Sequence, residues 1–594
     1  MEEFLSKVNK PGRYIGHEWN LPVKNPGKAK ISFVISFPDL YEVGMSNLGI
    51  RIIYGILNNI PDVLCERVFA VASDMEDALR KEDRELQSLE SGRRLKDFDF
   101  IGFSLGYELS YTNVLNILDL GKVPLKAEER DVIDPLVIGG GPCVLNPEPV
   151  ADFFDLFVIG EGEEVIVEII DIYRKLKGQF KSLRLKRKDL LLELSRIEGV
   201  YVPSLYEVTY TLLGKIGDFK PKIPGVPKKI KKRFVQDLDQ AFYPLNWIIP
   251  YIETVHDRIT IEIMRGCPNH CRFCQARQQY FPFRQRSINN LLNLGSKLYQ
   301  STGYDDISLS GLSVSDYKNI EELVKSLIGL FHGKTIGISL PSIKPKAMVG
   351  ELSSIIAKIK KTGLTFAPEV STERLRNVIA KDFNLDDFYG ALRQAYASGY
   401  QHVKLYFMIG IPTEEKEDLD GIIKMASRVS ELSREVSRRP AQVNISINTL
   451  IPKPHTAFQW FSMLGLDEIK QKQDYLRDKV REYLPAGRQE RLKVSCHNRY
   501  MTFLEGILSR GDRRLGEVIL NAFNSGCRLD AWVDQFKFEK WIAAFETAGI
   551  RPDFYLEERQ RNEFLPWDFL DIGTSKESLI KEAERAESGN KVLL

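Results

Sequence analysis

Short apolar runs alternate with amphipathic segments in the first part of the chain. Strand-like runs at 31–37, 98–105, 135–141 and 155–163 are separated by segments such as 46–60, in which apolar residues recur at helical spacing. A continuous β-branched run indicates a strand, and apolar residues three or four apart indicate a helix. Strands that alternate with helices predict a parallel, doubly wound sheet of Rossmann-like type. Ligands of such sheets lie beyond the carboxyl ends of the strands.

The same rhythm returns at about residue 258 and continues for some two hundred residues. Helical stretches separate six strand-like runs, which lie at 258–266, 305–313, 335–343, 363–370, 402–412 and 443–452. Six successive βα units predict a partial (β/α)6 barrel of the TIM type. From about residue 490 the pattern is mainly helical.

The chain is therefore predicted to be α/β, with a Rossmann-like domain at 1–177, a connector at 178–255, a partial barrel at 256–489 and a mainly helical region at 490–594. The connector contains basic stretches at 181–189 and 228–233. Aromatic residues do not interleave these lysines, which favours a solvated linker over an RNA-binding patch, although nucleic-acid binding stays open.

Composition limits the class of protein. The 594 residues carry 83 basic and 81 acidic side chains, for a net charge of +2, so no overall field recruits nucleic acid or an anionic membrane. The first residues lack the apolar core of a signal peptide, and no run of about eighteen apolar residues occurs. We therefore expect a cytoplasmic protein without membrane contact.

Three of the seven cysteines fall within eight residues, directly after a predicted strand. Cys267, Cys271 and Cys274 have the spacing CxxxCxxC, and the other four are scattered. Thiolates are soft ligands that suit zinc or iron–sulfur clusters. A structural zinc site needs four ligands, and no fourth lies within reach by sequence. Three thiolates on a cubane would leave one iron open, so a substrate-coordinating cluster is favoured over zinc.

This motif, with the aromatic Phe273 before its last cysteine, resembles that of the radical S-adenosylmethionine (SAM) superfamily. The resemblance implies a 4Fe-4S cluster on Cys267, Cys271 and Cys274, whose open iron chelates SAM. It implies reductive cleavage of SAM to methionine and a 5′-deoxyadenosyl radical. It also implies an electron donor such as a flavodoxin or ferredoxin, and sensitivity to air.

The resemblance extends to residues at the ends of later strands. It places Phe273 near the adenine and Glu369 on the fourth strand, facing SAM. After the second strand, the family has a glycine-rich contact to the SAM amino group, and the segment here departs from its usual Gly-Gly-Glu. After the fifth strand, the family has a backbone contact to adenine. The residues here are Ser310, Gly311 and Leu312 for the first contact, and Gly410 and Ile411 for the second. The alternative is that both glycines simply end strands and that Glu369 is an N-cap partner or a surface acid.

The N-terminal region resembles the cobalamin-binding domain of many radical SAM enzymes, whose pattern is Asp-x-His-x-x-Gly, then a serine motif, then paired glycines. The matching residues are Asp39, Gly44, Ser104, Gly139, Gly140 and Gly141. Tyr41 occupies the histidine position, and a phenol with a pKa near 10 is a poor cobalt ligand at neutral pH. We therefore expect cobalamin without a histidine lower ligand. The alternative is a vestigial domain that supports the barrel or binds substrate.

Over nearly its whole length, the chain resembles an uncharacterised family of B12-binding-domain radical SAM proteins. Relatives often have a small companion protein or domain of unknown function, and the resemblance supplies no substrate. The first hypothesis is a cobalamin-dependent enzyme that methylates an unactivated carbon. The second is a radical SAM enzyme that modifies RNA or peptide and uses the N-terminal domain to hold substrate. The third is a non-enzymatic metal-binding scaffold.

Two further segments carry chemistry-bearing side chains. The sequence SRGDRRLGE at 509–517 could contact an anionic substrate, but an ion-pair network between domains is favoured on general grounds. His455 could face the barrel mouth, although Pro452 and Pro454 favour an ordered loop.

Overall fold

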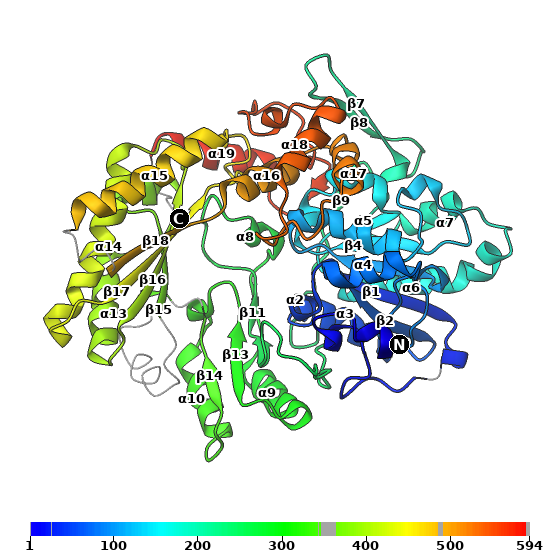
Figure 1. The fold of residues 1–594 in the computed structure, drawn as a ribbon, viewed down its shortest axis with the longest axis horizontal. Helices are drawn as coiled ribbons and strands as arrows, with labels where there is room; N and C mark the ends of the chain where they lie inside the picture. Colours follow the sequence, from blue (N-terminus) through cyan, green and yellow to red (C-terminus); the bar gives the residue numbers. More distant parts are fainter. Residues whose placement is uncertain (1, 25, 342–343, 346–363, 485–490, 590–594) are drawn as a thin grey trace.

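The computed structural model describes residues 2–24, 26–341, 344–345, 364–484 and 491–589 (Figure 1). The ends of two predicted strands, at 342–343 and at 363, lie outside the described residues, as does the predicted boundary at 489–490.

The N-terminal domain is an α/β sandwich around a sheet of order β2-β1-β3-β4-β5-β6. Strands β1 to β5 are parallel, and β6 runs antiparallel to β5. The strand bounds are β1 Ile31–Phe37, β2 Val63–Phe69, β3 Phe100–Ser104, β4 Leu136–Gly140, β5 Leu156–Val158 and β6 Val200–Tyr201. The helices include α3 Leu48–Asn59, α4 Ser73–Lys81, α5 Tyr111–Leu120 and α6 Gly162–Lys181. The doubly wound prediction is confirmed, and the switch point lies between β1 and β3.

Strand β2 was not predicted from the sequence. Its segment VLCERVF places Glu66 and Arg67 in the middle of the strand, yet every residue of β2 is buried. Arg67 is accommodated because Glu18 and Glu90 pair with it at 2.8 and 2.6 Å. Two charged residues therefore interrupt the apolar run in the sequence, although the strand lies inside the domain.

The barrel contains seven parallel strands within the described ranges, arranged in two sheets. One sheet has the order β10-β13-β14, and the other has the order β15-β16-β17-β18. The bounds are β10 Ile259–Glu262, β13 Asp306–Ser310, β14 Gly337–Ser339, β15 Leu364–Glu369, β16 His402–Ile409, β17 Gln442–Thr449 and β18 Leu492–Cys496. The main covering helices are α9 Ile288–Thr302, α10 Ile320–Leu330, α13 Leu385–Ala397, α14 Lys416–Ser437 and α15 Leu466–Tyr483.

The region from 490 is mainly helical, as predicted, but its first element is the strand β18. It pairs in parallel with β17 from Val443↔Leu492 to Ile447↔Cys496, so the barrel sheet continues past the predicted boundary. Polar Lys493 and Ser495 alternate with apolar positions along this edge strand, and the short alternation was too weak to recognise.

The predicted connector is also folded onto the rest of the chain. Besides β6, it contains α7 (Arg187–Leu194), a hairpin of β7 (Tyr206–Tyr210) with β8 (Ile216–Pro221), and β9 (Ile230–Lys231). Its basic stretches make internal contacts. Arg187 is buried against Asp155 at 2.8 Å, and Arg233 pairs with Glu164 and Glu168. These contacts contradict the prediction of a solvated linker.

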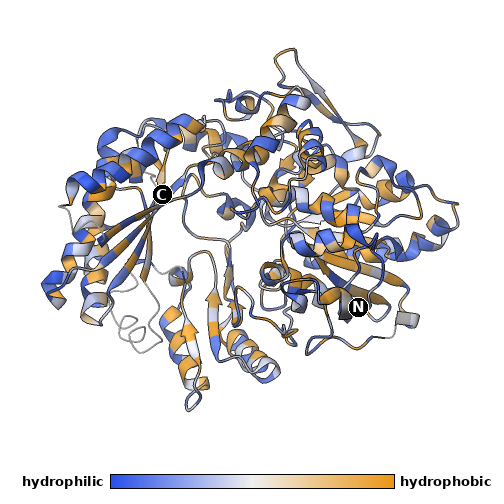
Figure 2. Ribbon diagram, viewed as in Figure 1, coloured by the Kyte–Doolittle hydropathy of each residue, from blue (hydrophilic) through white to orange (hydrophobic). Residues whose placement is uncertain are grey.

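The C-terminal region packs against the N-terminal domain (Figure 1). Its helices are α16 Arg499–Arg510, α17 Leu515–Asn524, α18 Phe538–Thr547 and α19 Lys576–Glu587, and β19 (Leu570–Asp571) pairs with β9. Buried residues of α16 and α17, such as Leu504 and Val518, share one core with the N-terminal sheet. Figure 2 shows apolar strands inside both domains and polar outer faces on α14 and α15. In the described part of the chain, every helix is too short or too polar to cross a bilayer.

Candidate functional site

The three clustered cysteines lie in a loop held between two short paired strands. Strand β11 (Met264–Arg265) enters the loop, and antiparallel β12 (Arg284–Gln285) leaves it. Gly266 begins the loop with φ +79°, and a Cβ there would approach the Tyr280 carbonyl oxygen to 2.8 Å. Glycine is therefore required at this position, because an L side chain would be both strained and blocked. All three cysteines are half-buried and free of disulfides.

Glu369 and Lys381 lie beside the cysteine loop. The Lys381 ammonium donates to Glu369 Oε1 at 3.3 Å. Burial lowers the pKa of Lys381, but the nearby charges of Glu369 and Cys271 outweigh it, so that this pKa is raised. Burial raises the pKa of Glu369. Burial raises the pKa of Cys271 to about 12, with Lys381 acting in the opposite direction and Cys274, Cys267 and Glu369 in the same direction. The loop thus has one buried cation and one carboxylate at its side.

The thiols do not converge on a single point. Within the described residues, no three His, Cys, Asp or Glu side chains are grouped closely enough to hold one metal ion. In a 4Fe-4S cluster each cysteine binds a different iron, so the sulfur atoms are spaced around the cluster. Three half-buried thiols in one loop, with no fourth ligand grouped with them among the residues that the structure describes, therefore fit a cluster with one open iron better than they fit zinc.

Arg272 and Lys232 fix the loop on its two sides. Arg272 Nη1 donates to the carbonyls of Asn377 and Val378 at 2.8 and 3.0 Å, and its Nε donates to Glu582 at 2.9 Å. Lys232 Nζ donates to three carbonyls at the end of the helix that follows Cys274, namely those of Gln278, Gln279 and Phe281. A cation at these carbonyls satisfies acceptors left free at a helix C-terminus. The loop geometry is therefore supported by residues outside the motif.

A second polar group contacts the first cysteine. Asn269 Nδ2 donates to Cys267 Sγ at 3.2 Å and to Asp316 Oδ2 at 2.9 Å. Lys344 Nζ donates to Asn269 Oδ1 at 2.7 Å and pairs with Asp316 at 3.0 Å. Asn269 is thereby held with its amide hydrogen toward the sulfur atom of Cys267.

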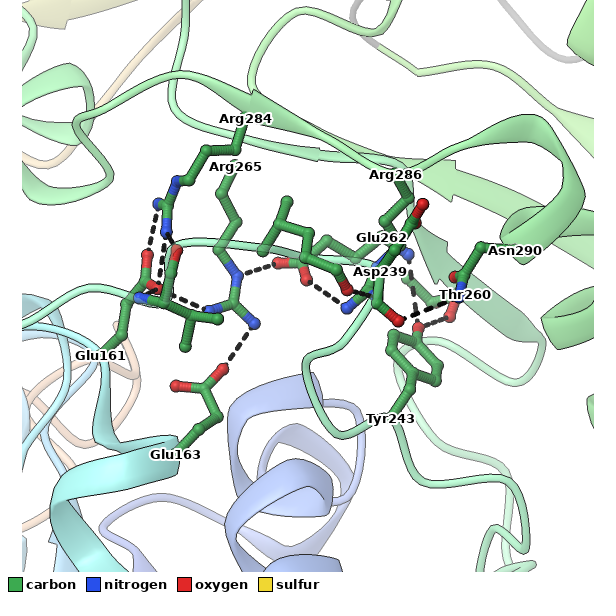
Figure 3. A network of polar contacts seen from close by, with 12 residues as sticks. Glu161, Glu163, Asp239, Tyr243, Thr260, Glu262, Arg265, Arg284, Arg286 and Asn290 are labelled. Atoms are coloured by element: carbon green, nitrogen blue, oxygen red, sulfur yellow. Dashed lines mark hydrogen bonds and ion pairs between the residues drawn. The ribbon is translucent and has the colours of Figure 1, made fainter.

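An ion-pair network ties this loop to the N-terminal domain (Figure 3). Arg265, just before the loop, pairs with Glu161 at 2.9 Å, Glu163 at 2.6 Å and Glu262 at 2.9 Å. Arg284 pairs with Glu161 at 2.6 Å. Glu161 and Glu163 lie at the start of α6, so both strands that flank the loop are attached to the N-terminal domain.

The other residues assigned by resemblance lie at the carboxyl ends of strands. Ser310 ends β13, and a Cβ on Gly311 would approach Met264 Cγ to 2.6 Å, so this glycine lets β13 pack closely against the strand that enters the loop. Leu312 is 38% exposed. Glu369 ends β15 with a left-handed φ of +68°. Contacts of these side chains with SAM stay predictions.

The proposed adenine contacts share one apolar cluster. Phe273 packs against a group of buried residues that includes Ile411, Val370 and Leu375. Gly410 has φ +80°, and its backbone nitrogen donates to Glu414 Oε2 at 3.0 Å. The fold therefore brings the residue before the last cysteine and the end of β16 to the same place, and their contact with adenine stays a prediction.

The residues that match the cobalamin-domain pattern fall into three environments. Tyr41 is buried, and its hydroxyl donates to Glu18 Oε1 at 2.9 Å, so it does not face a ligand. A Cβ on Gly44 would meet the Phe69 ring, and one on Gly139 would meet the Phe157 ring, so both glycines serve packing. A Cβ on Gly140 would meet open space.

The remaining three residues of that pattern lie where their strands end. Asp39 follows β1, and Trp532 Nε1 donates to its Oδ1 at 2.8 Å. Burial raises the pKa of Asp39, with the Trp532 hydrogen bond acting in the opposite direction. Ser104 ends β3, and Gly141 follows β4 with φ +96°. The structure thus brings Asp39 and Ser104 to the switch point of the sheet.

The segment that follows β17 contacts this same edge of the N-terminal sheet. Lys453 Nζ is buried and pairs with Glu108 at 2.7 Å and Glu505 at 2.9 Å. His455 is buried and lies 3.0 Å from the Leu145 carbonyl oxygen, and burial lowers its pKa to about 3. His455 therefore fixes a loop and is neutral at pH 7.

The arginines of SRGDRRLGE serve the interface between domains. Arg510 is fully buried, and its guanidinium donates to the backbone carbonyls of Tyr555, Pro452, Phe461 and Glu557. Arg513 pairs with Glu148 of the N-terminal domain at 3.1 Å. The interpretation as an interdomain ion pair is confirmed for Arg513, whereas Arg510 instead holds backbone carbonyls of the barrel end and the C-terminal region.

Sequence reasoning missed Lys381, Arg272, Asn269 and Lys232. Arg272 and Asn269 lie within the cysteine motif, where their closeness to the ligands was a usable signal. Lys381 and Lys232 lie far from the cysteines in sequence, so only the fold reveals them.

Two relatives and one solved structure illustrate the comparisons with known proteins. The uncharacterised protein MJ0966 of Methanocaldococcus jannaschii is 28% identical over 87% of this chain and 97% of its own length. The ribosomal protein uS12 methylthiotransferase RimO of Clostridium botulinum is 24% identical over 46% of this chain and 69% of its own. The radical SAM methyltransferase TsrM of Kitasatospora setae, solved with tryptophan and a SAM analogue, matches this chain with a TM-score of 0.44 at 12% identity. The match covers 70% of this chain and 72% of the TsrM chain.

Two family models match the two domains. The model described as radical SAM proteins, N-terminal, matches residues 49–203, and the model of the radical SAM superfamily matches residues 261–426. The second match begins in β10 and includes the whole cysteine loop, Glu369 and Lys381. The chain therefore belongs to the radical SAM superfamily.

Proposed function

We propose that this chain is a radical SAM enzyme that cleaves SAM reductively at a 4Fe-4S cluster held by Cys267, Cys271 and Cys274. Membership of the superfamily implies the cluster and SAM. The observation that carries the assignment is the half-buried cysteine loop, framed by β11 and β12 and flanked by Glu369 and Lys381.

When bound, the cluster supplies the electron that splits SAM into methionine and a 5′-deoxyadenosyl radical. The chain's own residues neutralise the charge of the thiolates and can orient SAM beside the loop. Lys381 places a positive charge beside Cys271 and Cys274, which offsets the negative charge of three thiolates. Glu369, at the end of β15, can accept hydrogen bonds from an ammonium group at the barrel mouth. Phe273 and Ile411 provide an apolar surface next to the loop.

Anaerobic reconstitution tests this assignment. We expect about four irons per chain and 5′-deoxyadenosine production in the presence of dithionite and SAM, and loss of both in a Cys267→Ala/Cys271→Ala/Cys274→Ala variant. Cys496→Ala is the matched control, because Cys496 is equally half-buried but lies on β18 outside the loop. Iron retained by the triple variant would sink the assignment. Bound iron without SAM cleavage would instead favour the metal-binding scaffold.

A second cofactor, cobalamin, is proposed for the N-terminal domain. The support is the sheet order with Asp39 and Ser104 at the switch point and the open space above Gly140. The residues fit only in part. Tyr41 is turned into the core, so no protein ligand to cobalt comes from this position.

Cobalt content after reconstitution with hydroxocobalamin and desalting decides between the two interpretations of this domain. Cobalt retained by wild type and by the triple cysteine variant would support a cobalamin-dependent enzyme and a search for a methylated product at an unactivated carbon. Iron without cobalt would favour a domain that holds substrate, such as RNA or peptide. Asp39→Asn with Trp532→Phe would then lower substrate affinity and leave iron content unchanged.

A further inference from the structure

A cavity lies between the N-terminal domain and the segment that leads into the barrel. Its volume is about 390 Å³, within the range of small-molecule sites. Residues of helix α3 and residues 242–248 make up most of its lining, and Pro22, Met45 and Arg67 complete it. The lining residues include no member of the cysteine loop and no strand end of the barrel, so this cavity is separate from the site already described.

The cavity wall contains a cation without a counter-ion. Arg51, in the first turn of α3, uses Nε and Nη2 to donate to the Met45 carbonyl at 3.0 and 2.7 Å. Its Nη1 is buried and has no hydrogen-bond partner. No carboxylate of the described chain lies within ion-pair distance of Arg51. A buried charge is costly unless it is paired.

Two acidic side chains near the cavity already pair with another cation, Arg67, which also lines it. Glu18 and Glu90 both pair with Arg67, and Glu90 also accepts from the Tyr54 hydroxyl at 3.1 Å. The ionisable groups that act most strongly on Arg51 are Tyr304, Arg67, Tyr243 and Tyr41, of which none carries a negative charge at pH 7. Among the described residues, none of these groups supplies Arg51 with a counter-charge.

The rest of the wall is mostly apolar. The Arg51 guanidinium stacks on Trp247 with 4.2 Å to the ring centroid. Phe242, Pro244, Leu245 and Ile248 line the same space, together with Ile50 of α3. The Trp247 indole nitrogen is occupied by the Pro244 carbonyl at 2.8 Å, so its ring presents only apolar surface. Such walls accept an apolar body rather than a bare inorganic ion.

We propose that this cavity binds a small organic anion, with its carboxylate, phosphate or sulfonate group on Arg51 and an apolar or aromatic body between α3 and residues 242–248. The ligand would supply the charge that Arg51 lacks and would bridge the N-terminal domain to the segment before β10. The proposal does not depend on the radical chemistry of the cysteine loop.

Dye binding to the full reconstituted chain tests the proposal. The probe is 8-anilinonaphthalene-1-sulfonate, followed by equilibrium dialysis under anaerobic conditions, with uncharged N-phenyl-1-naphthylamine beside it. We expect one sulfonated dye per chain and binding weaker by about tenfold or more in Arg51→Met, because a charged hydrogen bond is lost. Arg51→Lys should retain most of the binding, and the uncharged dye should bind wild type and Arg51→Met alike.

Two further variants distinguish binding in this cavity from dye binding elsewhere on the protein. Arg393→Met removes an exposed arginine of α13 and should leave dye binding unchanged. Asn59→Trp fills the exposed rim of the cavity and should block the binding of both dyes, although Arg51 is retained. This variant tests the location of the site even if Arg51→Met fails to fold. Equal dye binding by wild type and Asn59→Trp, or the absence of saturable binding, would overturn the proposal.

Competition identifies the head group and the body. Decanoate and phenyl phosphate should each displace the dye, and their relative strength distinguishes a carboxylate from a phosphate ligand. Displacement by inorganic phosphate at the same concentration as phenyl phosphate would contradict the apolar body.

Discussion

The Lys381 ammonium lies 3.3 Å from Glu369 Oε1, beside the thiols of Cys271 and Cys274. The pair joins the end of β15 to the segment after the next helix, and both side chains are largely buried. A buried cation next to the cysteine ligands lowers the electrostatic cost of adding an electron to a cluster there, because the reduced cluster carries one more negative charge.

Replacement of Lys381 should therefore make the reconstituted cluster harder to reduce. We expect Lys381→Met to lower the midpoint potential by roughly 60 mV or more, a tenfold change for a one-electron couple. An EPR-monitored redox titration measures this shift. Lys381→Arg, which keeps the charge, should stay near wild type, and an unchanged potential in Lys381→Met would show that the cation is too far from the cluster to matter.

Lys453 should be important for stability. Its removal leaves Glu108 and Glu505 buried without their shared cation, which costs about 3–5 kcal/mol. We expect Lys453→Met to lower the guanidinium midpoint followed by tryptophan fluorescence. Lys470→Met, at an exposed pair with Asp474, is the matched control and should change stability by less than about 0.5 kcal/mol.

Tyr41 should be structural and should not bind cofactor. Tyr41→Phe deletes the hydrogen bond to the buried Glu18 and should reduce stability by about 1–3 kcal/mol. Cobalt uptake from hydroxocobalamin should equal that of wild type, whatever its level. A selective loss of cobalt in Tyr41→Phe, with stability unchanged, would show that the phenol faces the ligand.

His455 should make stability depend on pH. Its pKa of about 3 in the folded chain lies below its ordinary value of about 6.5 in the unfolded chain, so the unfolded state binds the proton first as pH falls. Stability from this group is complete above about pH 6.5 and is lost toward pH 3. Between pH 7 and pH 5 the loss is about 2 kcal/mol.

A comparison with His455→Gln isolates this effect, since glutamine can still donate to the Leu145 carbonyl but does not titrate. The variant should lose less stability than wild type between pH 7 and pH 5. Asp530 acts in the opposite direction, because burial raises its pKa to about 6 and protonation then favours the folded state between pH 6 and pH 4. The same Asp530 contribution is present in both proteins and cancels in the comparison.

The alternation of strands and helices and the cysteine spacing were readable from the sequence, because both are local patterns. Strand β2 was missed because Glu66 and Arg67 lie in its middle, and their burial depends on Ser91, Glu18 and Glu90, which are distant in sequence. Lys381 was missed for the same reason, since only the fold brings it to the cysteines. Patterns that depend on one element can be recognised in a sequence, whereas buried charges depend on partners from several elements.

The contact of Arg272 with Glu582 has a consequence for biosynthesis. Glu582 lies on α19, the last helix of the described chain, 310 residues after the loop that it supports. During translation the cysteines leave the ribosome long before this partner exists. This contact forms only after α19 has been made and has folded back onto the loop, so the nascent loop lacks one of its supports while the cysteines are already present.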